Sequence, residues 1–299
     1  MPTTDVNGFT MYYEQDGDGT PLIYVHGGNT CLLHALLYGR RPFHWGWRQD
    51  FTEQFRFIWY ERRGCYRSST PDDDYGLESQ ASDLGMLLDH LNIECAHVVG
   101  MSAGGPIAVI FAATKPDRVR SLTLISTGLD LWPDDPKMAI VREQFAILQR
   151  EGAEAAFDQR PAEAEISLDP LWEREEMALL GKLDAWQERQ RTLTQDAADV
   201  PRVERIRRYA AELKDMTAGM NCDLPSYAAR VTARTLVIHG SADPIVPVDQ
   251  GQALAETLPH AEWRVVESEG HRMIFTNAEV RRTVIAFAKQ LELLPKIDG

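Results

Sequence analysis

Three residues of the chain have the types that acyl-transfer chemistry requires: a serine, an aspartate and a histidine. Ser102 stands in the run from Gly100 to Gly104, where a glycine lies two residues away on either side. This G-x-S-x-G spacing is typical of a sharp strand-to-helix turn, because larger side chains would collide with the strand and the helix. A serine hydroxyl is a weak nucleophile, and a histidine base oriented by a carboxylate can activate it to attack a carbonyl carbon. Asp243 and His271 are the candidates for those two roles.

Each of the three candidates follows a stretch that reads as a short strand. Residues 96–100 precede the serine, residues 235–239 precede the aspartate and residues 262–267 precede the histidine. The carboxyl ends of parallel strands lie at one edge of a sheet, where ligands bind in α/β proteins. We therefore expect the three side chains to meet at that edge. Asp130, which follows a strand predicted at 119–125, is a rival for the role of the acid.

The remaining elements predict the class of fold. Residues 5–16 contain Asn7-Gly8 and read as an antiparallel hairpin. Further strands are predicted at 21–25, 55–60 and 119–125, and helical patterns lie between the strands. Strands that alternate with helices form a mostly parallel sheet covered by helices on both faces. We therefore expect an α/β fold of this kind.

A long polar stretch with helical patterns and no strand signal interrupts the middle of the chain. Asp135-Pro136 and Asp169-Pro170 each place a capping carboxylate before a proline at the first helical position. Apolar residues then recur at helical spacing. We predict a helical cap at residues 128–229, inserted into a core formed by residues 1–127 and 230–299.

These motifs, taken together, resemble the α/β-hydrolase superfamily, in its branch with a serine nucleophile and an inserted cap. His26-Gly27-Gly28 follows a predicted strand, as the corresponding His-Gly motif does in that family. There, the residue after the first His-Gly and the residue after the nucleophile donate backbone N–H groups to the oxyanion. The resemblance therefore implies an oxyanion hole formed by Gly28 and Ala103. It covers residues 1 to about 127 and 230–299.

One motif departs from that family's pattern. The family often has D-x-R-G-x-G-x-S after the next strand, where this chain has Glu61-Arg62-Arg63-Gly64-Cys65-Tyr66-Arg67-Ser68. Glu61 stands in place of the aspartate, and Tyr66 stands in place of the second glycine. The two differences leave the expected fold unchanged, but the sequence does not specify the shape of this turn.

The segment between the candidate oxyanion loop and the strand at 55–60 is rich in aromatic residues. Aromatic side chains beside such a loop can line an apolar pocket. Asn29, His34 and Trp45 are therefore the candidates for contact with substrate. Trp47 and Phe51 are better explained as residues that pack the first helix against the sheet.

A serine nucleophile points to acyl transfer, and we expect hydrolysis of a small carboxylic ester or lactone. A proline iminopeptidase is the nearest alternative, because His26-Gly27-Gly28 and Arg63-Gly64-Cys65 resemble motifs of those enzymes. Their elbow usually carries a bulky tryptophan after the serine, whereas this chain has Ala103. A ligand-binding receptor on a hydrolase fold is a further alternative, because such proteins can keep an intact triad.

Composition and charge narrow the range of partners. With 299 residues, of which 44% are hydrophobic, the chain is long enough for one large core with an insertion. Its formal net charge of −14 disfavours nucleic acids and anionic membranes, since both require a basic surface. The sequence shows no Cys or His spacing typical of a metal site and no apolar run of membrane-spanning length. We expect a cytoplasmic protein that acts on a small molecule without a metal or other cofactor. The sequence leaves open whether the protein forms a homodimer.

Overall fold

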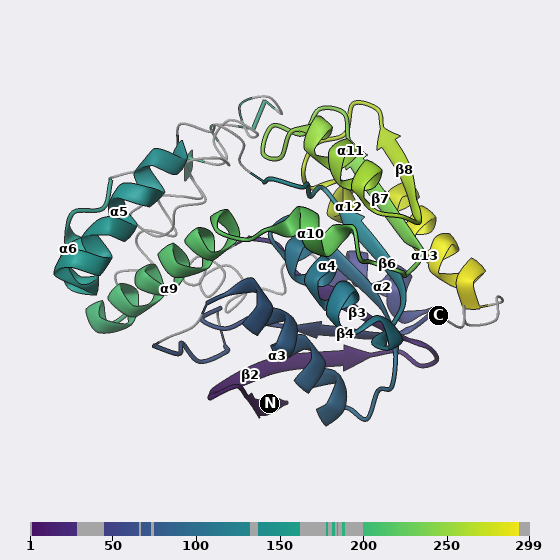
Figure 1. Ribbon diagram of the computed structural model, residues 1–299, viewed down its shortest axis with the longest axis horizontal. Helices are drawn as coiled ribbons and strands as arrows, with labels where there is room; N and C mark the ends of the chain where they lie inside the picture. The colour runs from purple at the N-terminus through teal and green to yellow at the C-terminus, as the bar shows by residue number, and fades with distance from the viewer. Residues whose placement is uncertain are drawn as a thin grey trace.

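The computed structural model describes residues 2–28, 45–65, 67–72, 75–131, 137–161 and 200–292, together with residues 178, 181, 182, 184, 187 and 188. The side chains of residues 45 and 46 are not described. A central sheet carries helices on both faces, and a smaller group of helices lies to one side (Figure 1). No helix in the described segments is both long and apolar enough to cross a membrane.

One eight-stranded sheet forms the centre of the molecule, in the order β1-β2-β4-β3-β5-β6-β7-β8. The strands are β1 (Thr3–Val6), β2 (Phe9–Asp16), β3 (Pro21–Val25), β4 (Arg56–Tyr60), β5 (Ala96–Met101), β6 (Val119–Ile125), β7 (Thr235–Gly240) and β8 (Ala261–Val266). The pairs β1–β2 and β2–β4 are antiparallel, and the other neighbouring strands run parallel. The predicted α/β fold with a mostly parallel sheet is therefore confirmed.

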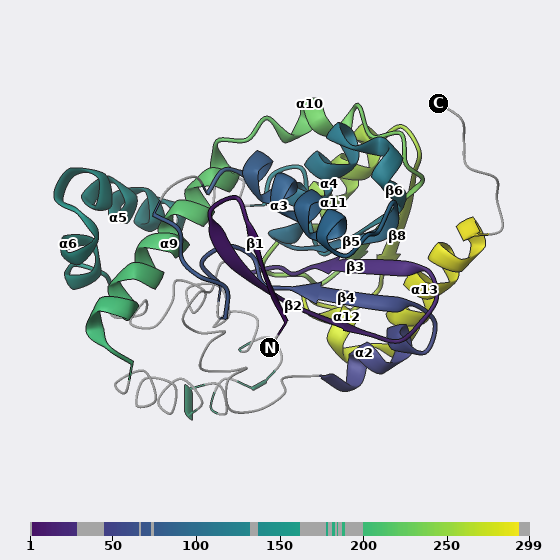
Figure 2. The same cartoon turned by 90° about the horizontal axis from the view of Figure 1, so that it is seen from below.

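Helices cover both faces of the sheet (Figure 2). Each face has its own apolar cluster. One face carries α3 (Leu77–His90), α4 (Gly104–Thr114), α10 (Leu224–Ala228) and α11 (Val248–Thr257), with the short 3-10 helix η1 (Pro116–Arg118) after α4; the other carries α2 (Trp45–Thr52), α12 (Met273–Thr276) and α13 (Ala278–Glu292). Ile23 of β3 belongs to the first cluster and its neighbours Leu22 and Tyr24 to the second, because successive side chains of a strand point to opposite faces. Trp47 and Phe51 pack α2 into the second cluster, as expected.

Three of the described helices between β6 and β7 form a lobe to one side of the sheet (Figures 1 and 2). They are α5 (Lys137–Glu151), α6 (Ala153–Asp158) and α9 (Arg202–Met220), and they share an apolar cluster that includes Phe157 and Tyr209. The helix α10 then returns the chain to the core, since its Leu224 belongs to the same cluster as the buried residues of α4. The helix starts expected at Asp135 and Asp169 lie outside the described residues.

Candidate active site

Ser102 lies in a sharp turn between β5 and α4. Its φ of +48° is in the left-handed region, which residues other than glycine seldom adopt and which surrounding contacts must maintain. The Ser102 N–H donates to the Ile125 carbonyl at 3.0 Å, and the Gly105 N–H donates to the Ser102 carbonyl at 2.8 Å. The Thr127 hydroxyl donates to the same carbonyl at 2.9 Å. Both neighbouring segments, β6 and the start of α4, therefore hold the strained serine in place.

Lack of space explains the glycines on either side of this serine. A Cβ at Gly100 would lie 2.8 Å from the Cβ of Ala108, and one at Gly104 would lie 2.3 Å from the Val25 carbonyl oxygen. Neither contact can be relieved without shifting a strand or a helix, since backbone cannot rotate away as a side chain can. The two glycines thus allow α4 to approach β3 and β5 closely enough to form the turn.

The structure brings Ser102, His271 and Asp243 together at the carboxyl ends of their strands. His271 Nε2 lies 3.0 Å from Ser102 Oγ, and His271 Nδ1 lies 2.8 Å from Asp243 Oδ2. A carboxylate can only accept, so Nδ1 carries the proton and Nε2 is free to accept the proton of the serine hydroxyl. This is the arrangement in which an imidazole can act as a general base on a serine.

Donors surround the Asp243 carboxylate on both oxygens. Oδ1 accepts the backbone N–H groups of Ile245 and Val246, at 2.9 and 3.0 Å. Oδ2 faces His271 and also His239, whose Nε2 lies 3.2 Å away. Burial by itself would raise the pKa of Asp243, but attraction to His271 and the hydrogen bonds from both histidines hold it well below its usual range. Asp243 is therefore an anion whose orientation is set from four sides.

His239 has a place in this site that sequence reasoning missed. It is the fourth residue before Asp243, at the end of β7, and is fully buried. Its Nε2 also lies 2.9 Å from the Val246 carbonyl oxygen, so both neighbours of Nε2 are acceptors and Nε2 carries a proton. A histidine four residues ahead of a candidate acid was visible in the sequence, but only the turn after β7 brings its ring to the carboxylate.

The rival acid, Asp130, lies in the loop after β6. It is exposed, and its backbone N–H donates to the Gln250 side chain at 3.1 Å. The carboxylate that the structure places on His271 Nδ1 is that of Asp243. The geometry thus favours the acid turn after β7 over the loop after β6.

The candidate oxyanion residues lie on both sides of the serine. A Cβ at Gly27 would lie 2.7 Å from the Ser102 Cβ, so the loop after β3 is in contact with the turn. Gly28 follows with a φ of +72°, and its carbonyl accepts a hydrogen bond from Arg62 Nη2. Ala103 is buried and precedes the first turn of α4, where backbone N–H groups have no partner within the helix. Both residues are thus positioned beside the serine.

The three expected substrate-contact residues remain predictions. Asn29 and His34 lie outside the described residues. Trp45 is the first residue of α2, and its side chain is not described. Within the described segments, no group of three or more His, Cys, Asp or Glu side chains is placed to hold a metal ion.

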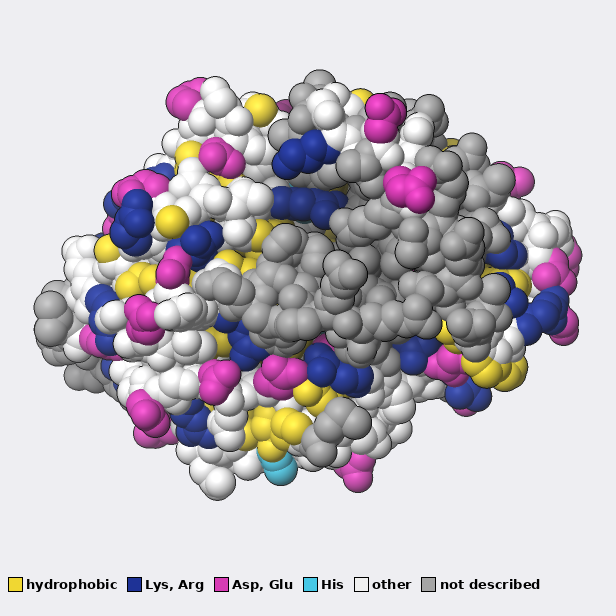
Figure 3. Space-filling model, turned by 180° about the vertical axis from the view of Figure 1, so that it is seen from behind, with side chains coloured by type: hydrophobic (Ala, Val, Ile, Leu, Met, Phe, Trp, Pro, Cys, Tyr) yellow, Lys and Arg dark blue, Asp and Glu magenta, His cyan; other side chains and the backbone are white. Residues whose placement is uncertain are grey.

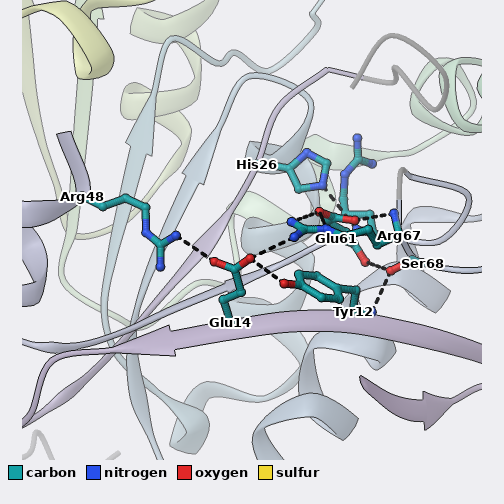
Figure 4. Close-up of polar contacts among 8 residues, drawn as sticks. Tyr12, Glu14, His26, Arg48, Glu61, Arg67 and Ser68 are labelled. Carbon is teal, nitrogen blue, oxygen red and sulfur yellow. Dashed lines mark hydrogen bonds and ion pairs between the residues drawn. The ribbon is translucent and has the colours of Figure 1, made fainter. Parts of the chain in front are cut away.

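The turn after β4, where the sequence departs from the family pattern, is built on Glu61 (Figure 4). Glu61 Oε2 accepts the backbone N–H of Arg67 at 2.6 Å, and Oε1 accepts Arg67 Nε at 2.8 Å. The same guanidinium donates to Glu14 at 3.0 Å and stacks on the ring of Tyr12, and Glu14 also accepts from Arg48. Burial raises the pKa of Glu61, although Arg67 opposes this effect. The Glu61 carboxylate, which is longer than that of an aspartate, thus holds the turn in place. Tyr66 lies outside the described residues.

A second serine, histidine and carboxylate meet at the opposite end of the sheet. His97 Nδ1 lies 2.7 Å from Ser121 Oγ, and His97 Nε2 lies 3.8 Å from Glu292 Oε1. Ser121 is only 1% exposed, and burial lowers the pKa of His97 to about 4. A hydroxyl that no substrate can reach cannot act as a nucleophile, so this group is part of the core.

A comparison with models of protein families shows to which family the chain belongs. Residues 20–278 match the model of the alpha/beta hydrolase fold. The chain belongs to the alpha/beta hydrolase family. This assignment agrees with the strand order, with antiparallel β2, and with a serine in the turn after β5.

This alpha/beta hydrolase is similar to enzymes with different named substrates. It is 29% identical over 277 residues to the putative carbamate hydrolase RutD of Serratia proteamaculans (strain 568), covering 90% of this chain and 92% of that protein. It is 27% identical over 297 residues to 2-hydroxy-6-oxo-6-phenylhexa-2,4-dienoate hydrolase of Comamonas testosteroni, covering 96% and 93%. Among solved structures, MGS-M2, an alpha/beta hydrolase enzyme from a Medee basin deep-sea metagenome library, matches with a TM-score of 0.71 at 18% identity, covering 100% of this chain and 99% of that one. The chain is thus a hydrolase of the alpha/beta fold.

Proposed function

We propose that this hydrolase cleaves a small carboxylic ester or lactone through an acyl-enzyme intermediate. Ser102 is the nucleophile, His271 the general base and Asp243 the acid that orients the base. The observation that carries the proposal is the chain of hydrogen bonds from Asp243 Oδ2 through His271 to Ser102 Oγ, with lengths of 2.8 and 3.0 Å. These hydrogen bonds leave the unprotonated Nε2 directed at the hydroxyl, as general-base activation of a serine requires.

In the first half of the reaction, His271 Nε2 takes the proton of Ser102 as Oγ attacks the carbonyl carbon of the substrate. Asp243 stabilises the imidazolium that forms. The backbone N–H groups of Gly28 and Ala103 bind the developing oxyanion, and each contributes about 3 kcal/mol to transition-state binding. His271 then returns its proton to the leaving alkoxide, and the bond between the carbonyl carbon and the leaving oxygen breaks.

In the second half, water attacks the acyl-enzyme. His271 removes a proton from the water as its oxygen bonds to the acyl carbon, and the same donors bind the second oxyanion. Ser102 regains its proton when the ester bond to Oγ breaks. A lactone follows the same course, except that its leaving alkoxide stays attached to the acyl group.

The lobe of α5, α6 and α9 is the proposed substrate cap, within the cap segment 128–229. Ile245, two residues after the acid, packs against the apolar cluster of this lobe. The same side chain packs against the cluster that contains Ala103, the residue after the nucleophile. The lobe is therefore in contact with the acid turn, and its position favours a role in covering the acyl group from water.

A small, neutral or weakly charged molecule is the proposed substrate class. The net charge of −14 opposes binding of large anions. On the face shown in Figure 3, Lys and Arg side chains lie among Asp and Glu side chains, and the described part of that face presents no continuous basic surface. A nucleic acid would need such a surface.

A carbamate is a second candidate substrate, favoured by the similarity to RutD over 90% of this chain. A carbamate offers the same kind of carbonyl carbon to the serine, although its nitrogen makes that carbon less electrophilic. The proline iminopeptidase alternative has less support, because Ala103 stands where those enzymes usually have a bulky tryptophan.

A hydrolysis screen tests the substrate class. It compares short and long p-nitrophenyl esters, lactones, a small O-alkyl carbamate and prolyl-naphthylamide under one set of conditions. We expect the highest kcat/KM for an ester or a lactone. A higher value for the carbamate would select the second candidate, and a preference for the prolyl amide would reject both.

The nucleophile is tested by Ser102→Ala and by a fluorophosphonate probe. The variant keeps the backbone donors, so it should remain folded with only residual activity. The probe should label the parent protein at Ser102, as located by peptide mass spectrometry. Stoichiometric labelling of the variant at another serine, with activity retained, would assign the chemistry elsewhere.

A further inference from the structure

Arg62 connects three separate parts of the molecule from a buried position after β4. Its side chain is only 2% exposed. Nη2 donates to the carbonyl of Gly28 in the candidate oxyanion loop. Nη1 donates to Gln80 of α3 at 2.8 Å and to both oxygens of Asp215 of α9, each at 3.1 Å. One side chain therefore contacts the loop after β3, the core helix α3 and the helix α9 of the lobe.

Asp215 of α9 is held by hydrogen bonds from Arg62 and Gln80. The residue is 5% exposed, and its carboxylate accepts from Gln80 Nε2 at 2.6 Å as well as from Arg62. Gln80 Nε2 also donates to the Tyr75 carbonyl at 3.0 Å. A buried ion pair persists only where hydrogen bonds offset the cost of removing both charges from water, and this network supplies those bonds.

The lobe has an apolar cluster of its own, separate from this network. The helix α9 contributes Tyr209, Leu213 and Met216 to the apolar cluster that joins it to α5 and α6. Ala211, on the side of the helix toward the core, packs with Cys65 of the turn after β4. Asp215 is therefore a buried charge in the contact between α9 and the turn that contains Arg62, where an apolar side chain would pack as well.

Gly28 is the residue in this network that most needs an external restraint. Its φ of +72° is accessible to glycine, but glycine without a Cβ has no intrinsic preference that would keep it there. A hydrogen bond to its carbonyl fixes the peptide group that follows and thus limits rotation about Gly28. An oxyanion hole requires donors that are oriented before the reaction begins.

We propose that Arg62 is a positioning residue that holds Gly28 in its oxyanion-binding conformation, and that Asp215 sets the position of Arg62. The docking of α9 on the core thereby determines whether the oxyanion hole is formed. The inference rests on the proposed function, since it assumes that the Gly28 N–H binds the oxyanion. Asp215 acts on the reaction through Arg62 and Gly28 and touches no reacting atom.

Two variants test the link, each chosen to keep the size of the side chain. Asp215→Asn removes the charge that holds the guanidinium, and Arg62→Lys keeps the cation but cannot reach Gly28, Gln80 and Asp215 together. The control is Glu204→Gln, which breaks a more exposed ion pair with Arg208 on the same helix α9. The readouts are kcat and KM for a short p-nitrophenyl ester, the affinity for a phenylboronic acid, and the thermal unfolding midpoint.

We expect both variants to lower kcat about tenfold or more with little change in KM, because the oxyanion is stabilised only in the transition state. The affinity for the boronic acid, which forms a tetrahedral adduct on the serine, should fall by a similar factor. Glu204→Gln should keep the parent values. Folded variants that retain the parent kcat and boronic acid affinity would overturn the proposal.

A double variant separates positioning from stability. Arg62→Met combined with Asp215→Leu replaces the ion pair by apolar groups, a change that often preserves or raises stability. We expect a folded protein whose kcat stays low, because no donor reaches the Gly28 carbonyl. Recovery of the parent kcat in this variant would show that the network acts through stability alone. Loss of the proposed function is recognised separately, by activity that survives Ser102→Ala.

Discussion

At the scale of single residues, the proposed chemistry depends on how each polar atom is satisfied. Asp243 receives four N–H groups, two from the backbone and two from histidines. The two backbone donors fix the carboxylate so that Oδ2 faces His271. The two histidines then share that oxygen, and only His271 also reaches the serine. Of the two imidazoles on this oxygen, His271 is therefore the one placed to act as the proposed base.

The assignment of the acid predicts different effects for two aspartates. Asp243→Asn places an amide beside His271 Nδ1 and favours the wrong tautomer, so kcat should fall by up to ~10⁴-fold. Asp130→Asn should change kcat little, because Asp130 is exposed in the loop after β6. Steady-state kinetics with one ester distinguish the two cases. A large loss in Asp130→Asn with a small loss in Asp243→Asn would move the acid to that loop.

The second histidine on the acid gives another test. His239→Leu removes one donor from Oδ2, and the carboxylate then becomes more basic and pairs more strongly with protonated His271. In a plot of kcat/KM against pH, the rise on the acidic side should therefore move to higher pH. His239→Gln keeps an N–H group near the same position and should restore the parent profile. If both variants shift this rise in kcat/KM equally, the N–H donor of His239 does not act on Asp243.

At the scale of elements, the turn at Ser102 depends on the approach of α4 to the sheet. Gly104→Ala would place a Cβ 2.3 Å from the Val25 carbonyl oxygen, a backbone atom of β3. We expect the free energy of unfolding to fall by about 3 kcal/mol, as in other overpacked cores. Urea unfolding followed by circular dichroism measures this change.

Gly85→Ala is the control for that glycine substitution, because Gly85 lies in the helix α3 and, like Gly104, has no positive φ. A Cβ there would have its nearest contact at 3.4 Å, with the Phe111 side chain. Its replacement should leave the free energy of unfolding unchanged or raise it by up to about 1 kcal/mol, because alanine has the higher helix propensity. A loss for Gly104→Ala no larger than that of Gly85→Ala would mean that the close approach of α4 to β3 does not require glycine in the turn.

At the scale of the whole molecule, His97 makes the free energy of unfolding depend on pH. Burial lowers its pKa to about 4 from its ordinary value of 6.5, so between these values the unfolded chain binds a proton that the folded protein does not. Stability therefore falls as the pH drops from about 6.5 to about 4, by about 3 kcal/mol for this one group. Below the folded pKa, both states are protonated and this contribution changes no further.

His97→Gln provides the comparison, because glutamine does not titrate. The free energy of unfolding of the variant, measured in urea at several pH values, should depend less on pH than that of the parent between pH 6.5 and pH 4. The two curves should converge as the pH falls. Parallel curves over this range would show that His97 is not the group responsible.

The sequence by itself determined the features that rest on short segments. The buried strand at 21–25 is a run of apolar residues, and the G-x-S-x-G spacing reports a local steric requirement. The order of serine, aspartate and histidine follows from which strand each one ends. Such features need only neighbours along the chain, so pattern and spacing are sufficient to predict them.

Only the tertiary structure decided which distant side chains meet. Arg62 and Asp215 are 153 positions apart, and no spacing rule connects a turn after β4 with a helix of the lobe. Glu61 could be seen as a departure from a family pattern, but its contacts with Arg67 required the folded turn. The contact of His239 with Asp243 likewise depends on the bend of the chain after β7. Contacts of this kind depend on the packing of whole elements, which the order of residues in one segment does not encode.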